Sequence, residues 1–266
     1  WNAAWRAAGY LALAEIDACR AQWALALEHL QVSLRHDTDN LRARNLEVIV
    51  LHRLGRRAEA DQRLAATLAL DPLDGSARWL GGQPLACDTQ TRIDLAIYLS
   101  RAGQFTDAIG LLSTALETAD AGTRPLLHYY LAAYLQQGGA TKEASEYRTR
   151  AASEKRDYCF PARLEDLVVL EDALHYTPTD AAAHYYLGNL LYDKRRHHEA
   201  ISHWDDSVRI DPAFPTVWRN LGIGRFNILG DAAAAHDAYE RAFALDPGDA
   251  RVLFERDQLW KRIGVA

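Results

Sequence analysis

The residues best suited to bind a metal ion gather in one short stretch. His197, His198 and His203 lie close together in sequence with Glu199, and imidazole and carboxylate groups are common zinc ligands. His198 and His203 are five residues apart, however, so they do not share a helix face well. The Arg195–Arg196 pair beside them would oppose a cation. We therefore interpret this stretch as a solvated turn between two helices.

The other histidines and the carboxylate pairs do not form a site either. His175, His184 and His236 are interpreted as surface or interface residues, and no metal site is predicted. The carboxylate pairs are adjacent residues, whose side chains diverge by about 100° on a helix and cannot flank one bond; they are Glu165–Asp166, Glu171–Asp172 and Asp205–Asp206. We find no glycine-rich phosphate loop, nucleophile elbow or dinucleotide fingerprint. The sequence therefore predicts a non-enzymatic protein without a cofactor.

Composition narrows the range of partners. The 266 residues carry a net charge of −6, and 49% are hydrophobic. Without a basic block, neither nucleic acid nor an anionic membrane is an expected partner. No apolar run approaches the roughly 18 residues of a membrane-spanning helix.

The three cysteines, Cys19, Cys87 and Cys159, fit no disulfide or zinc spacing. We interpret them as free, mostly packed thiols and expect a cytoplasmic protein.

The elements that would position any site follow from an internal repeat between residues 184 and 247. Leu187–Gly188 returns as Leu221–Gly222, 34 residues later, and Asp211–Pro212 returns as Asp246–Pro247. Three positions of the second helix return 35 residues later; Ala200, Trp204 and Ser207 become Ala235, Tyr239 and Ala242. A two-helix unit with a period near 34 resembles the tetratricopeptide repeat (TPR). This resemblance implies an all-α, right-handed TPR superhelix, or α-solenoid.

The repeat frame predicts one solenoid over residues 1–266, with about six helix-turn-helix repeats. Their expected ranges are 1–38, 39–72, 89–122, 123–156, 179–212 and 213–248. A connector is expected at 73–88, with a helical turn at 76–80, and a capping or truncated helix at 249–266. An extra helix is expected within 157–178, opened by Pro161. Its apolar spacing predicts that one face is buried, with Leu164, Leu167, Val168, Leu170 and Leu174 on it.

Three segments extend the resemblance to a narrower group. Asp157–Pro161, Tyr185–Arg196 and Phe214–Gly222 are similar to large bacterial proteins in which a β-rich amino-terminal domain precedes a long tetratricopeptide array. The chain lacks methionine, including an initiator, and is expected to be a piece of such a protein. The resemblance implies that the missing β-rich domain is one candidate partner.

The tetratricopeptide resemblance also implies a binding surface, because such arrays bind along a concave face lined by the first helix of each repeat. Aromatic, amide and guanidinium groups at these positions suit peptide recognition. The implied partner-binding residues are Arg44, Tyr129, Tyr185, Asn189, Tyr192, Arg219, Asn220 and Arg251, with Phe226 and Phe254 beside them. Alternatively, the aromatic side chains simply pack between helices.

A known variant of this surface, the clamp for a terminal carboxylate, fits poorly. Asn189, Asn220 and Arg251 occupy clamp-like positions, but Tyr185 replaces a lysine and Glu255 replaces a base. The leading hypothesis is a scaffold that binds a protein or peptide segment in its groove. The alternatives are a structural array that packs on its own β-rich domain or self-associates, and an enzyme or sugar-binding protein that serves carbohydrate metabolism.

Overall fold

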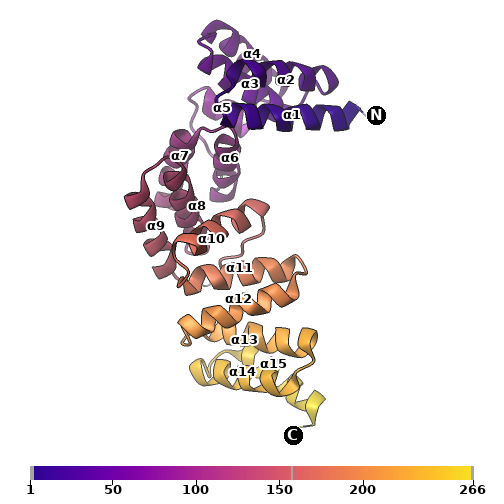
Figure 1. The fold of residues 1–266 in the computed structure, drawn as a ribbon, viewed down its shortest axis with the longest axis vertical. Coiled ribbons are helices and arrows are strands. Elements are labelled where there is room, and N and C mark those ends of the chain that lie inside the picture. Colours follow the sequence, from indigo (N-terminus) through magenta and orange to yellow (C-terminus); the bar gives the residue numbers. More distant parts are fainter. Residues whose placement is uncertain (1–2, 157, 265–266) are drawn as a thin grey trace. The chain divides into compact units, whose positions relative to one another are not determined.

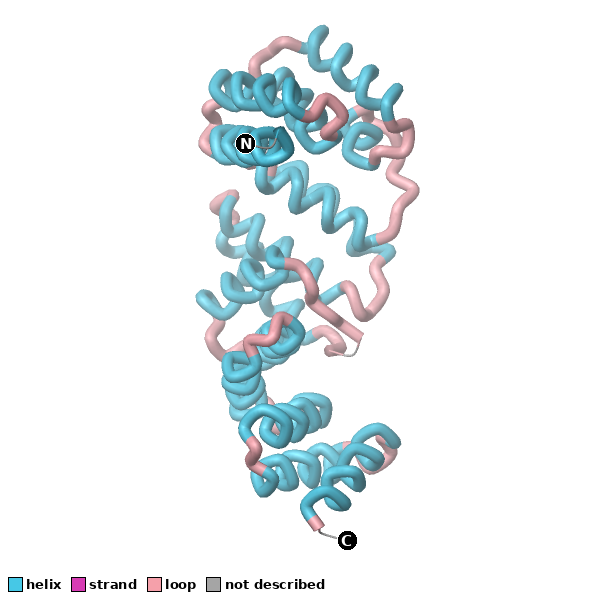
Figure 2. Tube along the Cα trace, turned by 90° about the vertical axis from the view of Figure 1, so that its right-hand side faces the viewer, coloured by secondary structure: helices cyan, strands magenta, loops and turns pink. Residues whose placement is uncertain are grey.

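The computed structural model describes residues 3–156 and 158–264, and the chain divides into two compact units. The first unit comprises residues 1–119 with 137–139, and the second comprises 120–136 with 140–266. Within the described ranges every regular element is helical (Figure 2), which confirms the predicted all-α class. None of these helices combines the length and hydropathy needed to cross a membrane.

The first unit is built from consecutive helices that pack in pairs, α1 with α2, α3 with α4 and α6 with α7 (Figure 1). The short helix α5 lies in the predicted connector. The bounds are α1 (Ala3–Cys19), α2 (Trp23–His36), α3 (Leu41–Arg53), α4 (Arg57–Leu70), α5 (Gly75–Leu80), α6 (Thr89–Arg101) and α7 (Phe105–Thr118).

The second unit continues the same pattern, and α11 packs on α12 as α13 packs on α14. Its bounds are α8 (Arg124–Gln137), α9 (Thr141–Ser153), α10 (Leu164–Tyr176), α11 (Ala181–Asp193), α12 (His197–Ile210), α13 (Pro215–Gly224), the π-helical turn η1 (Arg225–Leu229), α14 (Ala232–Leu245) and α15 (Ala250–Ile263). The last helix, α15, packs against α14.

Small residues and one recurring hydrogen bond hold each pair together. Ala14 and Ala26 are fully buried between α1 and α2, so the two backbones approach closely. The Ser33 hydroxyl donates to the carbonyl of Ala7 at 2.8 Å. In the second unit the Ser207 hydroxyl donates to the carbonyl of Ala181, also at 2.8 Å and across the same 26-residue separation. The serine of the repeat frame therefore ties the second helix to the start of the first.

The recurring Asp-Pro pair ends the second helix of a repeat. Asp71, Asp211 and Asp246 follow the last residues of α4, α12 and α14. Each carboxylate accepts a hydrogen bond from the backbone N–H two residues further on, at 2.8–3.1 Å. This is the turn geometry that aspartate favours, and the following proline stops the helix because it lacks an N–H group.

The π-helical turn accounts for the two repeat periods, 34 and 35 residues. The first helices of the two copies are in register up to Gly222, whereas Ala235 arrives one residue late. Between these positions lies η1, where the hydrogen bonds span five residues instead of four. The N–H of Gly230 donates to the carbonyl of Arg225 across five residues, and the N–H of Asp231 donates to the same carbonyl at 3.0 Å. The extra residue is therefore absorbed within one helical turn.

The structure has a helix in the expected segment, but it starts later than predicted and its buried face is only partly the predicted one. Helix α10 begins at Leu164, three residues after Pro161, and Leu164 and Val168 are exposed. Leu170 is buried as predicted, but the other buried positions are Asp166, Val169 and Ala173. A buried polar interaction explains the difference: Asp166 is fully buried and accepts a hydrogen bond from the Tyr130 hydroxyl at 2.7 Å. This bond sets the rotation of α10 about its axis.

The cysteines are free, as predicted, but only one of the three is well packed. Cys19 is exposed, Cys87 is half-buried and Cys159 is buried. Burial raises the pKa of the Cys159 thiol to about 12, which leaves almost no nucleophilic thiolate at neutral pH.

A thiol reagent should therefore distinguish these cysteines. We expect 5,5′-dithiobis(2-nitrobenzoic acid) to modify Cys19 first in the native protein and to spare Cys159 until the protein is unfolded in guanidinium chloride. Mass spectrometry of proteolytic peptides would locate the modified residues. Equal rates at Cys19 and Cys159 in native protein would contradict the packing described above.

Candidate partner-binding cavity

Six of the predicted partner-binding residues line one cavity in the second unit, with a volume of about 390 Å³. Three helices contribute them: Tyr185, Asn189 and Tyr192 from α11, Arg219 and Asn220 from α13, and Arg251 from α15. Six further residues complete the lining, namely Tyr158, Phe160, Trp204, Thr216, Ile223 and Asp249. We call this space the α11–α13 cavity.

Helical spacing explains why these side chains meet. Tyr185, Asn189 and Tyr192 follow one another at intervals of four and three residues, which places them on one face of α11. Thr216, Arg219 and Ile223, at intervals of three and four residues, likewise share one face of α13. Because α11 and α13 are the first helices of successive pairs, their corresponding faces border the same space.

A chain of polar side chains runs across the floor of the cavity. The indole N–H of Trp204 donates to Asn189 Oδ1 at 3.1 Å, and Asn220 Nδ2 donates to the same oxygen at 3.0 Å. An indole nitrogen can only donate, so the Asn189 atom that faces it must be the oxygen. This fixes the orientation of both amides and points Asn189 Nδ2 elsewhere. Among the described residues, Asn189 Nδ2 has no hydrogen-bond partner.

Glycine makes room for this chain. A Cβ atom on Gly188 would lie 2.5 Å from the indole ring of Trp204, and one on Gly222 would lie 2.6 Å from the ring of Tyr239. The two copies of the Leu-Gly pair thus accept the aromatic residue of the second helix in their own repeat. Gly188 brings the Trp204 indole within reach of Asn189.

The two arginines of the cavity differ in charge compensation. The Arg219 guanidinium forms a two-pronged ion pair with Glu255, with Nε donating to Oε2 at 2.8 Å. Glu255 also accepts a hydrogen bond from Tyr239 at 3.4 Å, and burial, followed by this carboxylate, raises the pKa of Tyr239. Arg251, in contrast, is exposed, and its guanidinium pairs with no described side chain. The available positive charge of the cavity therefore lies at Arg251.

Two exposed aromatic residues border the cavity, and sequence reasoning missed them as site residues. Tyr158 is 83% exposed and Phe160 is 73% exposed, and both precede α10. The sequence feature that could have identified them is the presence of two aromatic residues in a segment that interrupts the repeat. Trp204 was missed for a different reason: its place in the repeat frame indicated packing alone. In addition, Tyr185 packs edge-on against Phe214, with ring centroids 4.9 Å apart.

The other two predicted residues lie elsewhere. Tyr129 is 1% exposed, and its hydroxyl donates to Asp180 Oδ2 at 2.9 Å, so it belongs to the core and presents no surface to a partner. Burial holds its pKa well above the usual value. Arg44 belongs to the first unit, where its Nε donates to the carbonyl of Thr38 at 2.7 Å. Phe226 and Phe254 line a separate cavity of about 350 Å³.

The solved structures that are similar to this chain have low sequence identity to it. YrrB, described as a TPR protein with an unusual peptide-binding site, is 14% identical; the match covers 86% of this chain and 97% of YrrB, with a TM-score of 0.34. A structure of MamA is 18% identical over 75% of this chain and 94% of its own, with a TM-score of 0.33.

MamA from Desulfovibrio magneticus RS-1 is 16% identical over 92% of this chain and 97% of its own, with a TM-score of 0.32. No protein-family model matches the chain. The fold follows from the chain itself, through the 34-residue recurrence, the paired helices and the small residues packed between them. Together these features give the described chain a tetratricopeptide-type repeat fold.

Proposed function

We propose that the protein is a non-catalytic interaction scaffold that binds a linear segment of a partner protein at the α11–α13 cavity. The observation that carries this proposal is the convergence of three kinds of available group in one place. Within the described part of the chain, Asn189 Nδ2 is an amide donor without an acceptor and Arg251 is a cation without a carboxylate partner, while Tyr158 and Phe160 are exposed aromatic rings.

Each group has a counterpart in a peptide. An amide donor suits a backbone carbonyl, and rigid aromatic rings bind apolar side chains at a low cost in conformational entropy. A guanidinium forms strong, two-pronged hydrogen bonds with a carboxylate. The cavity therefore suits an extended segment with an apolar side chain beside an acidic residue. Its volume lies within the range of about 300–1,000 Å³ that is typical of ligand sites.

The charges at the cavity favour an internal acidic residue over a terminal carboxylate. Arg219 is already paired with Glu255, and Asp249 accepts hydrogen bonds from the backbone N–H groups of Arg251 and Val252 at the start of α15. Among the described residues that line the cavity, Arg251 is therefore the one cation left to bind an anion. The one lining carboxylate, Asp249, is engaged by these backbone N–H groups, and no histidine, cysteine or lysine lines the cavity.

A selection for peptides tests this proposal. Tag-free wild-type protein would be panned against a phage library of random linear peptides, and an enriched peptide would be measured by fluorescence polarisation. We expect Arg251→Glu to weaken binding at least tenfold, or about 1.4 kcal/mol, because it replaces the attractive charge with a repulsive one. Phe160→Ala should weaken binding by loss of apolar contact.

Lys142→Glu provides the matched control, because it makes the same change of charge at an exposed position of α9 outside the cavity. Its affinity should equal that of the wild type. Equal binding of the peptide to wild type, Arg251→Glu and Phe160→Ala would reject the cavity as the binding site. A library that yields no peptide with saturable binding would count against the proposed function itself.

A further inference from the structure

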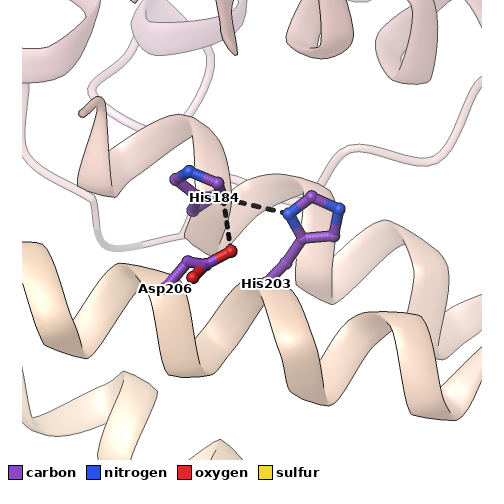
Figure 3. Close-up of side chains that lie close together, drawn as sticks. All are labelled: His184, His203 and Asp206. Carbon is purple, nitrogen blue, oxygen red and sulfur yellow. Dashed lines mark hydrogen bonds and ion pairs between the residues drawn. The ribbon is translucent and has the colours of Figure 1, made fainter. Parts of the chain in front are cut away.

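Two histidines and an aspartate meet outside the α11–α13 cavity, where α11 packs on α12 (Figure 3). His184 comes from α11, and His203 and Asp206 come from α12. His184 Nδ1 lies 3.0 Å from His203 Nδ1 and 3.9 Å from Asp206 Oδ2. One ligand atom from each residue falls within 4.8 Å of the other two.

The tautomer of His184 is suited to a metal. His184 Nε2 lies 3.1 Å from the carbonyl oxygen of Pro178, which can only accept, so Nε2 carries the proton. In the neutral ring, Nδ1 then holds its lone pair and faces His203 and Asp206. Metal-binding histidines are commonly oriented by such a bond from the other ring nitrogen to a carbonyl. His184 is 9% exposed, which fixes its ring in this position.

Helix α12 supplies the other two ligands. His203 and Asp206 are three residues apart and therefore share a helix face. The two oxygens of Asp206 have different neighbours. Oδ1 accepts a hydrogen bond from the Arg209 guanidinium, and Oδ2 faces His184.

We propose that His184 Nδ1, His203 Nδ1 and Asp206 Oδ2 bind one divalent transition-metal ion of the zinc type. Imidazole with carboxylate is a donor set suited to such ions. Tetrahedral coordination at about 2.0–2.1 Å requires ligand atoms roughly 3.3 Å apart, so the imidazole nitrogens need to separate by only a few tenths of an ångström. In the metal-free protein the proton between these nitrogens belongs to His203 Nδ1, and binding moves it to Nε2 or to water.

The site has room for a further ligand, because three protein ligands leave at least one coordination position open. His203 and Asp206 are only half-buried, so water or a side chain of a partner can fill that position. Sequence spacing concealed the site: His184 and His203 are 19 residues apart and meet only because α11 and α12 are antiparallel neighbours.

Titration of tag-free, metal-free protein with Co²⁺ and Zn²⁺ tests the proposal. We expect one saturable site, visible as Co²⁺ ligand-field absorption and as a rise in Tm with Zn²⁺. His203→Ala should lower the affinity by more than tenfold. His198→Ala, an exposed histidine on the same helix, should bind like the wild type. Absorption typical of cobalt–thiolate coordination would place the ion on a cysteine and overturn the assignment.

A variant that binds Zn²⁺ more tightly provides a test that a failure to fold cannot imitate. The Arg209 side chain is 72% exposed and competes with the ion for Asp206. Arg209→Ala should therefore leave the fold intact and bind Zn²⁺ more tightly than the wild type. Undiminished binding by His203→Ala, or no saturable binding by the wild type, would overturn the proposal. Neither result bears on peptide binding, because none of the three ligands lines the α11–α13 cavity.

Discussion

Replacement of Gly188 with alanine is expected to lower the free energy of unfolding by about 1–3 kcal/mol, the usual range for an overpacked core. The added methyl group would lie 2.5 Å from the indole of Trp204, which is 3% exposed and would have to shift out of its packed position. The displacement should also break the hydrogen bond from Trp204 to Asn189. Chemical denaturation followed by circular dichroism would measure the change.

Gly110→Ala is the matched control. Gly110 is exposed within α7, and a Cβ atom there would meet nothing within 4 Å. This substitution should stabilise the protein by about 0.5–1 kcal/mol, because alanine is the better helix former. A stabilising effect of Gly188→Ala as well would show that the second helix can shift freely, contrary to the packing described for the repeat.

The second large effect is expected at Asp166, whose carboxylate is fully buried and satisfies three donors. The Tyr130 hydroxyl lies at 2.7 Å, and the backbone N–H groups of Ala162 and Arg163 lie at 2.8 Å. Asp166→Ala would leave all three without a partner. Because hydrogen bonds to charged groups contribute about 1.5–3 kcal/mol each and are not additive, we expect a loss of roughly 3–5 kcal/mol.

A double-mutant cycle separates the tyrosine bond from the rest. Tyr130→Phe removes one donor and should cost about 1.5–3 kcal/mol in the wild-type background, but little once Asp166 is alanine. Glu171→Ala, an exposed change on the same helix, should stay within about 0.5 kcal/mol of the wild type. Purely additive effects of Asp166→Ala and Tyr130→Phe would contradict a direct bond between these side chains.

The all-α repeat could be predicted because short motifs within each repeat specify it. Leu-Gly and Asp-Pro mark positions where a missing side chain or a missing N–H group is required. The structure supplies the reasons: Gly188 and Gly222 accept aromatic rings, and the aspartates close the turns that follow. Such features depend on neighbours within one repeat, so one sequence is enough to reveal them.

What sequence could not predict depends on contacts between helices that the repeat frame does not specify. Hydrophobic spacing misplaced the buried face of α10, because a buried carboxylate at Asp166 is invisible to an apolar pattern. Tyr129 was assigned to a surface by analogy with the repeat frame, whereas its hydroxyl is taken by Asp180 at the start of α11. Likewise, the meeting of His184 with His203 requires knowledge of how two helices lie side by side.

The π-helical turn at Arg225–Leu229 has a consequence for how such a chain can change over time. It confines one inserted residue to the end of a first helix, so that α14 still places Tyr239 against Gly222. Single-residue insertions and deletions there can arise without disturbing the helices that follow. The end of the first helix is thus a position where the repeat can gain or lose one residue while Tyr239 still packs against Gly222.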